Sequence, residues 1–138
     1  MIRDRGGAVS YPADMNLAGA VIYVSDLDRM QRFYADCLGW TDVDHGEGYR
    51  GMASSAGLVT LVRSPDATPS AVPAPRRSET AIKLTVEVDS LVAARERITA
   101  AGGAVEPAST QWSFRGATHC DAVDPEGNVI GLIEPDQY

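Results

Sequence analysis

Residues 17–40, LAGAVIYVSDLDRMQRFYADCLGW, change their hydrophobic period halfway along. The first part is an apolar run typical of a strand, whereas the apolar side chains that follow recur at helical spacing. We expect Ser25 or Asp26 to be the N-cap, because such side chains accept a hydrogen bond from the first turn, and Gly39 to end the helix. The stretch therefore predicts a strand followed by a helix. The expected helical face consists of Leu27, Met30, Phe33, Tyr34 and Cys37.

The same layout returns 64 positions later, in residues 80–104, TAIKLTVEVDSLVAARERITAAGGA. Val24-Ser25-Asp26-Leu27 aligns with Val88-Asp89-Ser90-Leu91, and Gly39 aligns with Gly103. Short strand-like segments follow each helix, at about 41–44, 49–54 and 58–63, and again at about 104–106, 115–122 and 128–133. The sequence thus predicts an α+β fold, in which tandem βαβββ modules form a curled mixed sheet around a concave cavity with the helices on the outer face.

A proline-rich stretch, residues 64–79, separates the two halves and holds four of the eight prolines. It has no apolar period, so we interpret it as a surface linker. We predict a flexible N-terminal segment (1–16), a first module (17–63), the linker (64–79) and a second module (80–138). Together they form one structural domain, because 138 residues with 44% hydrophobic content suffice for a single core.

The composition excludes several classes of partner. A net charge of −7 disfavours binding to nucleic acid or to an anionic membrane surface, which leaves a small molecule or another protein. Cys37 and Cys120 lack the spacing of a metal site, and we expect two buried thiols in a reducing compartment. The sequence contains neither a signal-peptide apolar run nor an 18-residue apolar run, so we expect a cytoplasmic protein that does not enter membranes.

The duplicated βαβββ pattern, the segment VSDLDRMQRFYADCLGW and the final DPEGNVIGLIEP resemble the vicinal oxygen chelate superfamily. This superfamily includes glyoxalase I, bleomycin-resistance proteins, fosfomycin-resistance enzymes and type I extradiol dioxygenases. The resemblance covers nearly the whole chain from about residue 17. It implies a homodimer in which a module from each chain completes each cavity. One scaffold of this kind hosts several chemistries, so the fold alone does not assign a function.

The resemblance also implies where a metal ion would bind. The three ligand positions of the metal-dependent relatives correspond to Gly19, Lys83 and Gly131, and none of these is an ordinary ligand. The two histidines, His45 and His119, lie at other positions. We therefore expect no metal and no other cofactor, and a metal-dependent dioxygenase or glyoxalase is the least favoured activity.

Alternation along the strands predicts which side chains face the cavity. If Gly19, Lys83 and Gly131 face it, as their family counterparts do, then residues two positions away do so as well. The DPEGN turn, with proline and glycine at positions that favour a tight turn, is expected to place Asp121 opposite Gly131. The predicted polar lining is Tyr23, Lys83, Thr85, Glu87, His119 and Asp121.

Lys83 is the only lysine of the chain and lies between two apolar residues of an expected strand. It is a candidate base, imine-forming amine or anchor for an anionic or carbonyl group. Alternatively, it is a structural lysine paired with Glu87. His119 and Asp121 could form a base with its orienting carboxylate, or His119 could be a wall residue with no chemical role.

Aromatic residues could supply walls for a flat ligand. We expect Trp40, Tyr49, Trp112 and Phe114 at strand ends or in the loop before residue 115. Arg115 could meet a ligand carboxylate at the cavity rim, or be a solvated loop residue. We interpret His45 as surface-exposed and Arg76-Arg77 as a solvated charge pair.

Three functions are compatible with these features. The first is a metal-free binding protein resembling the bleomycin-resistance type, which holds an antibiotic or a carbonyl metabolite in a dimer cavity. The second is a metal-independent isomerase, cyclase or lyase that uses Lys83, Glu87, His119 or Asp121 for proton transfer. The third is a module whose main role is association with another chain. We favour the first, because no nucleophile–base pair stands at positions that the family supports.

Overall fold

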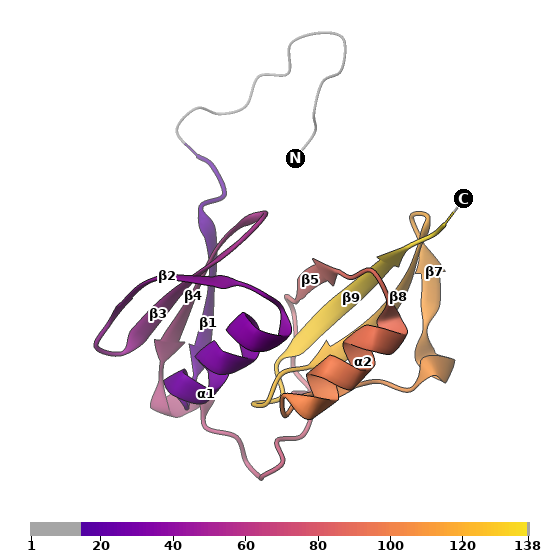
Figure 1. The fold of residues 1–138 in the computed structure, drawn as a ribbon. Coiled ribbons are helices and arrows are strands. Elements are labelled where there is room, and N and C mark those ends of the chain that lie inside the picture. The colour runs from indigo at the N-terminus through magenta and orange to yellow at the C-terminus, as the bar shows by residue number, and fades with distance from the viewer. Residues whose placement is uncertain (1–14, 138) are drawn as a thin grey trace, which may run out of the picture.

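Two βαβββ modules lie side by side in the computed structural model, which describes residues 15–137 (Figure 1). The predicted N-terminal segment 1–16 falls almost entirely outside these residues. The first module contains β1 (Gly19–Val24), α1 (Leu27–Arg32), the π-helical turn η1 (Phe33–Cys37), β2 (Thr41–Gly46), β3 (Tyr49–Ser54) and β4 (Gly57–Arg63). After the 3₁₀ turn η2 (Pro65–Ala67), the second contains β5 (Leu84–Glu87), α2 (Leu91–Ala100), β6 (Ala104–Val105), the 3₁₀ turn η3 (Ala108–Thr110), β7 (Trp112–Phe114), β8 (Ala117–Val123) and β9 (Val129–Pro135).

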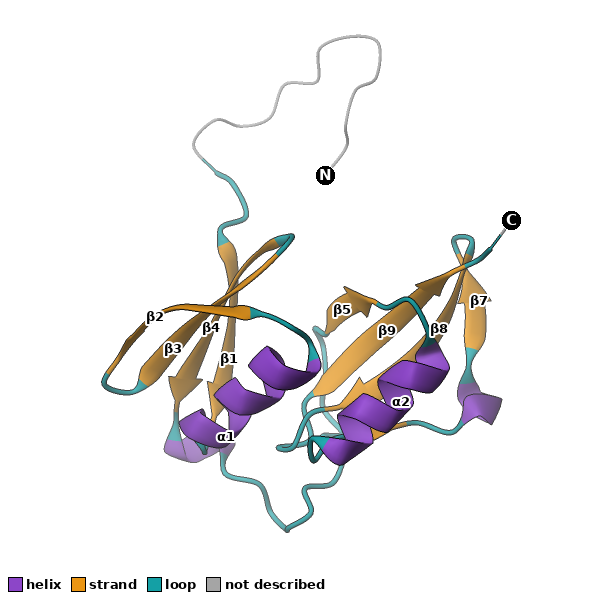
Figure 2. Ribbon diagram, viewed as in Figure 1, coloured by secondary structure: helices purple, strands orange, loops and turns teal. Residues whose placement is uncertain are grey.

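Each module has its own mixed sheet. The first sheet has the order β1-β4-β3-β2, and the second has β5-β9-β8-β6 with β7 paired to β8. In each, the first strand runs parallel to the last strand and the remaining pairs are antiparallel. One helix packs on each sheet, and both helices lie on the same side of the molecule (Figure 2). The predicted α+β tandem is therefore confirmed, with two adjacent sheets in place of one continuous sheet.

Both helices begin where the sequence indicates. The Asp26 side chain accepts a hydrogen bond from Arg29 N at 3.1 Å, so Asp26 rather than Ser25 is the N-cap of α1. Ser90 caps α2 in the same way through Ala93 N, also at 3.1 Å. Gly39 follows the first helical segment with φ of 74°, a conformation that favours glycine. The second half of that segment is π-helical, which the apolar spacing did not predict.

A single hydrophobic core lies between the helices and the sheets and runs through both modules. At its centre, the hydroxyl of buried Tyr34 donates to a carboxylate oxygen of buried Asp124 at 2.7 Å. The Glu126 carboxylate, from the same turn, accepts from the backbone N–H groups of Ser25 (2.7 Å) and Asp26 (2.8 Å) at the start of α1. The turn between β8 and β9 thus fastens the second module to the first helix. Buried core members include Val24, Met30, Phe33, Met52, Leu61, Leu91, Ile98, Cys120, Ile130 and Leu132.

The last hairpin has the predicted register, because Asp121 lies opposite Gly131 and His119 opposite Ile133. Its neighbourhood differs from the prediction in two ways. Trp112 to Phe114 form a strand, β7, rather than a loop, and the strand expected from residue 115 begins at Ala117. Arg115 instead occupies the β7–β8 turn with φ of 51°. A three-residue strand is too short to give a detectable alternation.

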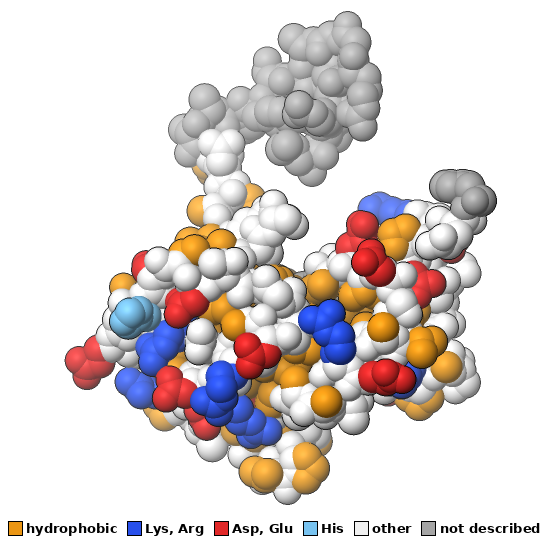
Figure 3. Space-filling model, in the orientation of Figure 1, with side chains coloured by type: hydrophobic (Ala, Val, Ile, Leu, Met, Phe, Trp, Pro, Cys, Tyr) orange, Lys and Arg blue, Asp and Glu red, His pale blue; other side chains and the backbone are white. Residues whose placement is uncertain are grey.

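The remaining expectations concern the surface and the thiols. Cys37 and Cys120 are buried and unpaired, as predicted, and desolvation raises the pKa of the Cys37 thiol although Arg97 opposes the shift. On the helix-covered side of the first module, basic and acidic side chains are intermixed (Figure 3). No helix within residues 15–137 is long and apolar enough to cross a membrane.

Candidate ligand site on the open face of the second sheet

Each sheet has one face that the helices leave uncovered. We call these the first open face, formed by β1 to β4, and the second open face, formed by β5 and β7 to β9. The first is mainly apolar, with Val21 and Tyr23 on β1 being 53% and 60% exposed. The second carries most of the predicted polar lining. Its members are Thr85, Glu87, His119, Asp121 and Ile133, with Trp112 and Phe114 at one edge.

An ion pair between Lys83 and Asp121 lies at the centre of the second open face. Lys83 Nζ donates to Asp121 Oδ1 at 2.7 Å, and Nζ also lies 5.2 Å from the centroid of the Trp112 ring. The Asp121 side chain is only 14% exposed, whereas that of Lys83 is 35% exposed. The predicted ion pair of Lys83 with Glu87 is therefore wrong, because Lys83 pairs with Asp121. Lys83 itself precedes β5 by one residue.

Arg76 reaches the same carboxylate from the linker, contrary to the predicted solvated charge pair. Its Nη2 lies 3.0 Å from Asp121 Oδ2, and its Nη1 lies 3.1 Å from Glu106 Oε1. Hydrogen bonds to Glu106 and then Asp121 raise the pKa of the Arg76 guanidinium. The neighbouring Arg77 donates to the backbone oxygen of Ala67 at 2.7 Å. The Arg76–Asp121 contact joins positions 45 residues apart, so no local pattern in the sequence could indicate it.

The aromatic part of the site is centred on His119. Its ring stacks on Trp112, with centroids 5.5 Å apart and planes 20° apart, and meets Phe114 edge-on at 5.6 Å. His119 Nε2 lies 2.9 Å from the Phe114 carbonyl oxygen. Within residues 15–137 no hydrogen bond joins His119 to Asp121, whose two oxygens contact Lys83 and Arg76. The proposed base–carboxylate pair is therefore not formed.

Several predicted site residues lie elsewhere. Trp40 stacks on Tyr34 at 4.9 Å and packs against the core, and exposed His45 lies on β2. Tyr23 and Tyr49 lie on the first open face, according to the strand register. Arg115 lies in the turn beyond Phe114, with its guanidinium carbon 5.0 Å from that ring. The structure thus brings together Lys83, His119, Asp121, Trp112 and Phe114, together with the exposed Thr85 and Glu87.

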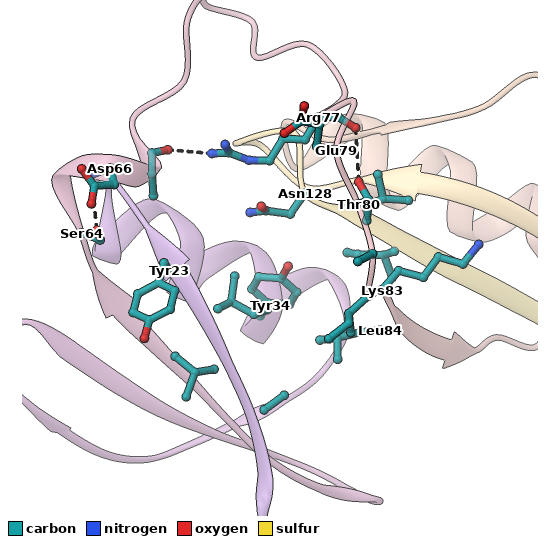
Figure 4. A pocket seen from close by; sticks show the side chains of 18 residues that line it. Tyr23, Tyr34, Ser64, Asp66, Arg77, Glu79, Thr80, Lys83, Leu84 and Asn128 are labelled. Atoms are coloured by element: carbon teal, nitrogen blue, oxygen red, sulfur yellow. Dashed lines mark hydrogen bonds between the residues drawn. The ribbon is translucent and has the colours of Figure 1, made fainter.

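A groove of about 650 Å³ separates the modules and borders both open faces. Its walls are residues 20–23 of β1 and residues 79–84 before and at the start of β5. Figure 4 shows Tyr34 and Asn128 pointing into the groove, whereas the Lys83 side chain leaves it and runs along the second sheet. Desolvation, reinforced by Asp124, raises the pKa of Tyr34 well above its ordinary value, and desolvation also raises the pKa of Asp124. Tyr34 and Asn128 both donate to Asp124, so these two polar side chains of the groove are already hydrogen-bonded.

The residues at the family ligand positions do not fit a metal ion. A Cβ atom on Gly19 would overlap the carbonyl oxygen of Leu58, so the backbone leaves no room for a side chain there. A Cβ atom on Gly131 would lie 3.3 Å from Lys83 Cε, because the lysine stem passes over this glycine. The third position is Lys83 itself. Across the described residues, no three or more His, Cys, Asp or Glu side chains are grouped so that they could hold an ion.

Paired βαβββ modules with both helices on one side define the glyoxalase/bleomycin-resistance/dioxygenase fold. The sequence model of the glyoxalase-like domain family matches residues 19–133, and the chain belongs to this family. It therefore lies in the vicinal oxygen chelate superfamily, as its sequence motifs predicted. No curated protein sequence matches it significantly.

Solved structures share the fold at low sequence identity. A glyoxalase/bleomycin resistance protein/dioxygenase family enzyme from Burkholderia phytofirmans PsJN is 16% identical, with a TM-score of 0.70 over 87% of this chain and 98% of that one. A glyoxalase-related enzyme from Fulvimarina pelagi is 16% identical, with a TM-score of 0.66 over 86% and 87% of the two chains. A mutant of the fosfomycin resistance protein FosX from Listeria monocytogenes, solved with Mn(II) and 1S,2S-dihydroxypropylphosphonic acid, is 13% identical, with a TM-score of 0.66 over 87% and 90%. These identities establish a common fold.

Proposed function

We propose that this protein binds a small organic molecule, such as an antibiotic or a carbonyl metabolite, without a metal ion. The observation that carries the proposal is the Lys83–Asp121 ion pair on the second open face. Lys83 and the nearby Gly131 are two of the three positions at which the family resemblance implies metal ligands. Lys83 supplies a positive charge and N–H donors at that place, and the other two family positions are glycines. A polar anchor beside aromatic walls is the usual composition of a small-molecule site.

The site is proposed to be completed by a second copy of the chain. The first open face exposes Val21, Tyr23 and Leu58, and such a contiguous apolar face favours association. A twofold axis would place the apolar face of one chain over the polar face of the other, twice. Analytical ultracentrifugation tests this part, because a dimer is expected for the wild type and a monomer for Tyr23→Asp.

A metal-independent isomerase, cyclase or lyase is the second candidate. His119 favours it, because an imidazole whose Nε2 faces a carbonyl oxygen carries its proton there and leaves Nδ1 as an acceptor. Such a group could remove a proton next to a carbonyl group. Binding remains the better supported proposal, because Lys83 and Asp121 are engaged with one another and, in the part of the chain that the structure describes, no carboxylate bonds to His119.

A thermal-shift screen of carbonyl metabolites and aromatic antibiotics tests the function. The screen is run with a chelator present, and each hit is then analysed by mass spectrometry after incubation with the protein. Stabilisation by a compound that is recovered unchanged supports binding, and conversion of the compound supports the enzyme. Hits that appear only when a transition metal is added contradict both.

A further inference from the structure

We infer that the ligand of the second open face is a planar organic carboxylate. Its acid group would bind Lys83 and Arg76, and its ring would lie against Trp112 and Phe114. This inference rests on the proposed function and specifies its ligand class.

Gly131 makes the position of Lys83 possible. Lys83 precedes β5, and its stem must cross β9 to bring Nζ to Asp121 on β8. It crosses at Gly131, where even a methyl group would lie 3.3 Å from Lys83 Cε and 3.2 Å from Thr85 Cγ2. Contacts of this length are tight, so a larger side chain would displace the stem. The glycine therefore positions the ammonium group.

The cluster offers accessible donors from two cations. Asp121 is 14% exposed and has both oxygens in ion pairs, whereas Lys83 and Arg76 are 35% and 44% exposed; the Glu106 carboxylate, 34% exposed, pairs with Arg76 on the side of the linker. An ammonium group has three N–H donors and a guanidinium group has five, so Lys83 retains donors beyond the one bonded to Asp121, and Arg76 retains donors beyond those bonded to Asp121 and Glu106. The two cations bind the two oxygens of one carboxylate, Lys83 at 2.7 Å and Arg76 at 3.0 Å, so both stand beside the place proposed for the acid group of the ligand. Charge-assisted hydrogen bonds of this kind are among the stronger polar contacts.

The aromatic residues supply a flat surface beside these donors. Trp112 is 40% exposed and Phe114 is 51% exposed, and His119 supports both rings from the sheet. Trp112 also lies next to Nζ, so a ring that packs on it brings its substituent to the ammonium group. An aromatic acid matches this juxtaposition of an apolar surface and two cations.

The test uses 2-naphthoate and its uncharged isostere 2-naphthamide as probes. Isothermal titration calorimetry of the full chain, in buffer containing a chelator, should show naphthoate binding at least about tenfold more tightly than naphthamide. Lys83→Met should abolish this preference and Lys83→Arg should retain it. Arg32→Met, which removes one positive charge from α1, is the matched control and should leave the preference unchanged. Circular dichroism verifies that each variant is folded.

A second variant separates the effect of the position of the Lys83 ammonium group from the effect of its charge. Gly131→Val keeps both cations but displaces the Lys83 stem, so it should also abolish the preference for the acid. Equal affinity of the wild type for both probes, an unchanged preference in Lys83→Met, or no binding of either probe would overturn the inferred ligand class. The proposed function fails separately, when naphthoate binding or the hits of the thermal-shift screen depend on added metal.

Discussion

Two glycines, Gly19 in the first module and Gly131 in the second, correspond to positions at which the family resemblance implies metal ligands, and their surroundings differ. At Gly19 the carbonyl oxygen of Leu58 occupies the place of a side chain. At Gly131 the space is bounded by side chains, the methyl group of Thr85 and the flexible stem of Lys83. The first position is thus closed by backbone, whereas the second is used by another residue. The two glycines therefore differ in what a side chain would meet: backbone at Gly19, and a flexible side chain at Gly131.

The largest effect should come from a methyl group at the closed position. We expect Gly19→Ala to lower the free energy of unfolding by about 2 kcal/mol, because backbone cannot move aside cheaply. Urea denaturation measures the change. Gly57→Ala is the matched control, because a Cβ atom there meets nothing within 4 Å, and its free energy of unfolding should remain near that of wild type. Equal stability of the two variants would contradict a closed position.

The next effect is a loss of stability at alkaline pH, and it concerns the hydrogen bond between Tyr34 in the first module and Asp124 in the second. Burial and Asp124 raise the pKa of Tyr34 in the folded protein above the ordinary value of 10.0. Below pH 10 the phenol is protonated in both states, but above it only the unfolded chain releases the proton, so stability falls as pH rises. The expected loss from this group is about 1.4 kcal/mol per pH unit.

Tyr34→Phe is the variant that isolates this contribution. Denaturation at pH 9 and pH 11 should show a smaller loss of stability for Tyr34→Phe than for wild type, because phenylalanine has no proton to release. Parallel losses in the two proteins would show that the Tyr34–Asp124 contact does not carry the alkaline transition.

A methyl group at the second glycine should have a much smaller effect on stability. We expect Gly131→Ala to change the free energy of unfolding by less than about 0.5 kcal/mol, because a side chain can yield where backbone cannot and alanine restricts the unfolded chain. The same denaturation series as for Gly19→Ala measures it. A cost equal to that of Gly19→Ala would remove the distinction between the two glycines.

Features with a local cause could be predicted from the sequence. The change from strand to helical period gave both strand–helix pairs, the Asp26 cap is a local hydrogen bond, and the DPEGN turn fixed the register that sets Asp121 opposite Gly131. Because side chains alternate along a strand, this register also put His119 and Asp121 on one face. The family motifs implied which positions correspond to metal ligands in relatives.

Features that depend on long-range contacts could not be predicted. Arg76 reaches Asp121 because the linker brings it to the second sheet. Trp40 packs against the core, where its ring stacks on that of Tyr34. Neither contact produces a periodic pattern in the sequence. The pairing of Lys83 with Asp121 rather than Glu87 likewise depends on the open path over Gly131, which exists only once β5, β8 and β9 are assembled.

The proposed function depends on ligand binding without a metal ion, with the ammonium group of Lys83 as the positive charge of the site. Its most direct test is the metal content of the purified protein, measured by inductively coupled plasma mass spectrometry after expression in medium supplemented with manganese, iron, nickel and zinc. The account predicts no stoichiometric transition metal in the wild type. One iron, manganese, nickel or zinc ion per chain would contradict it.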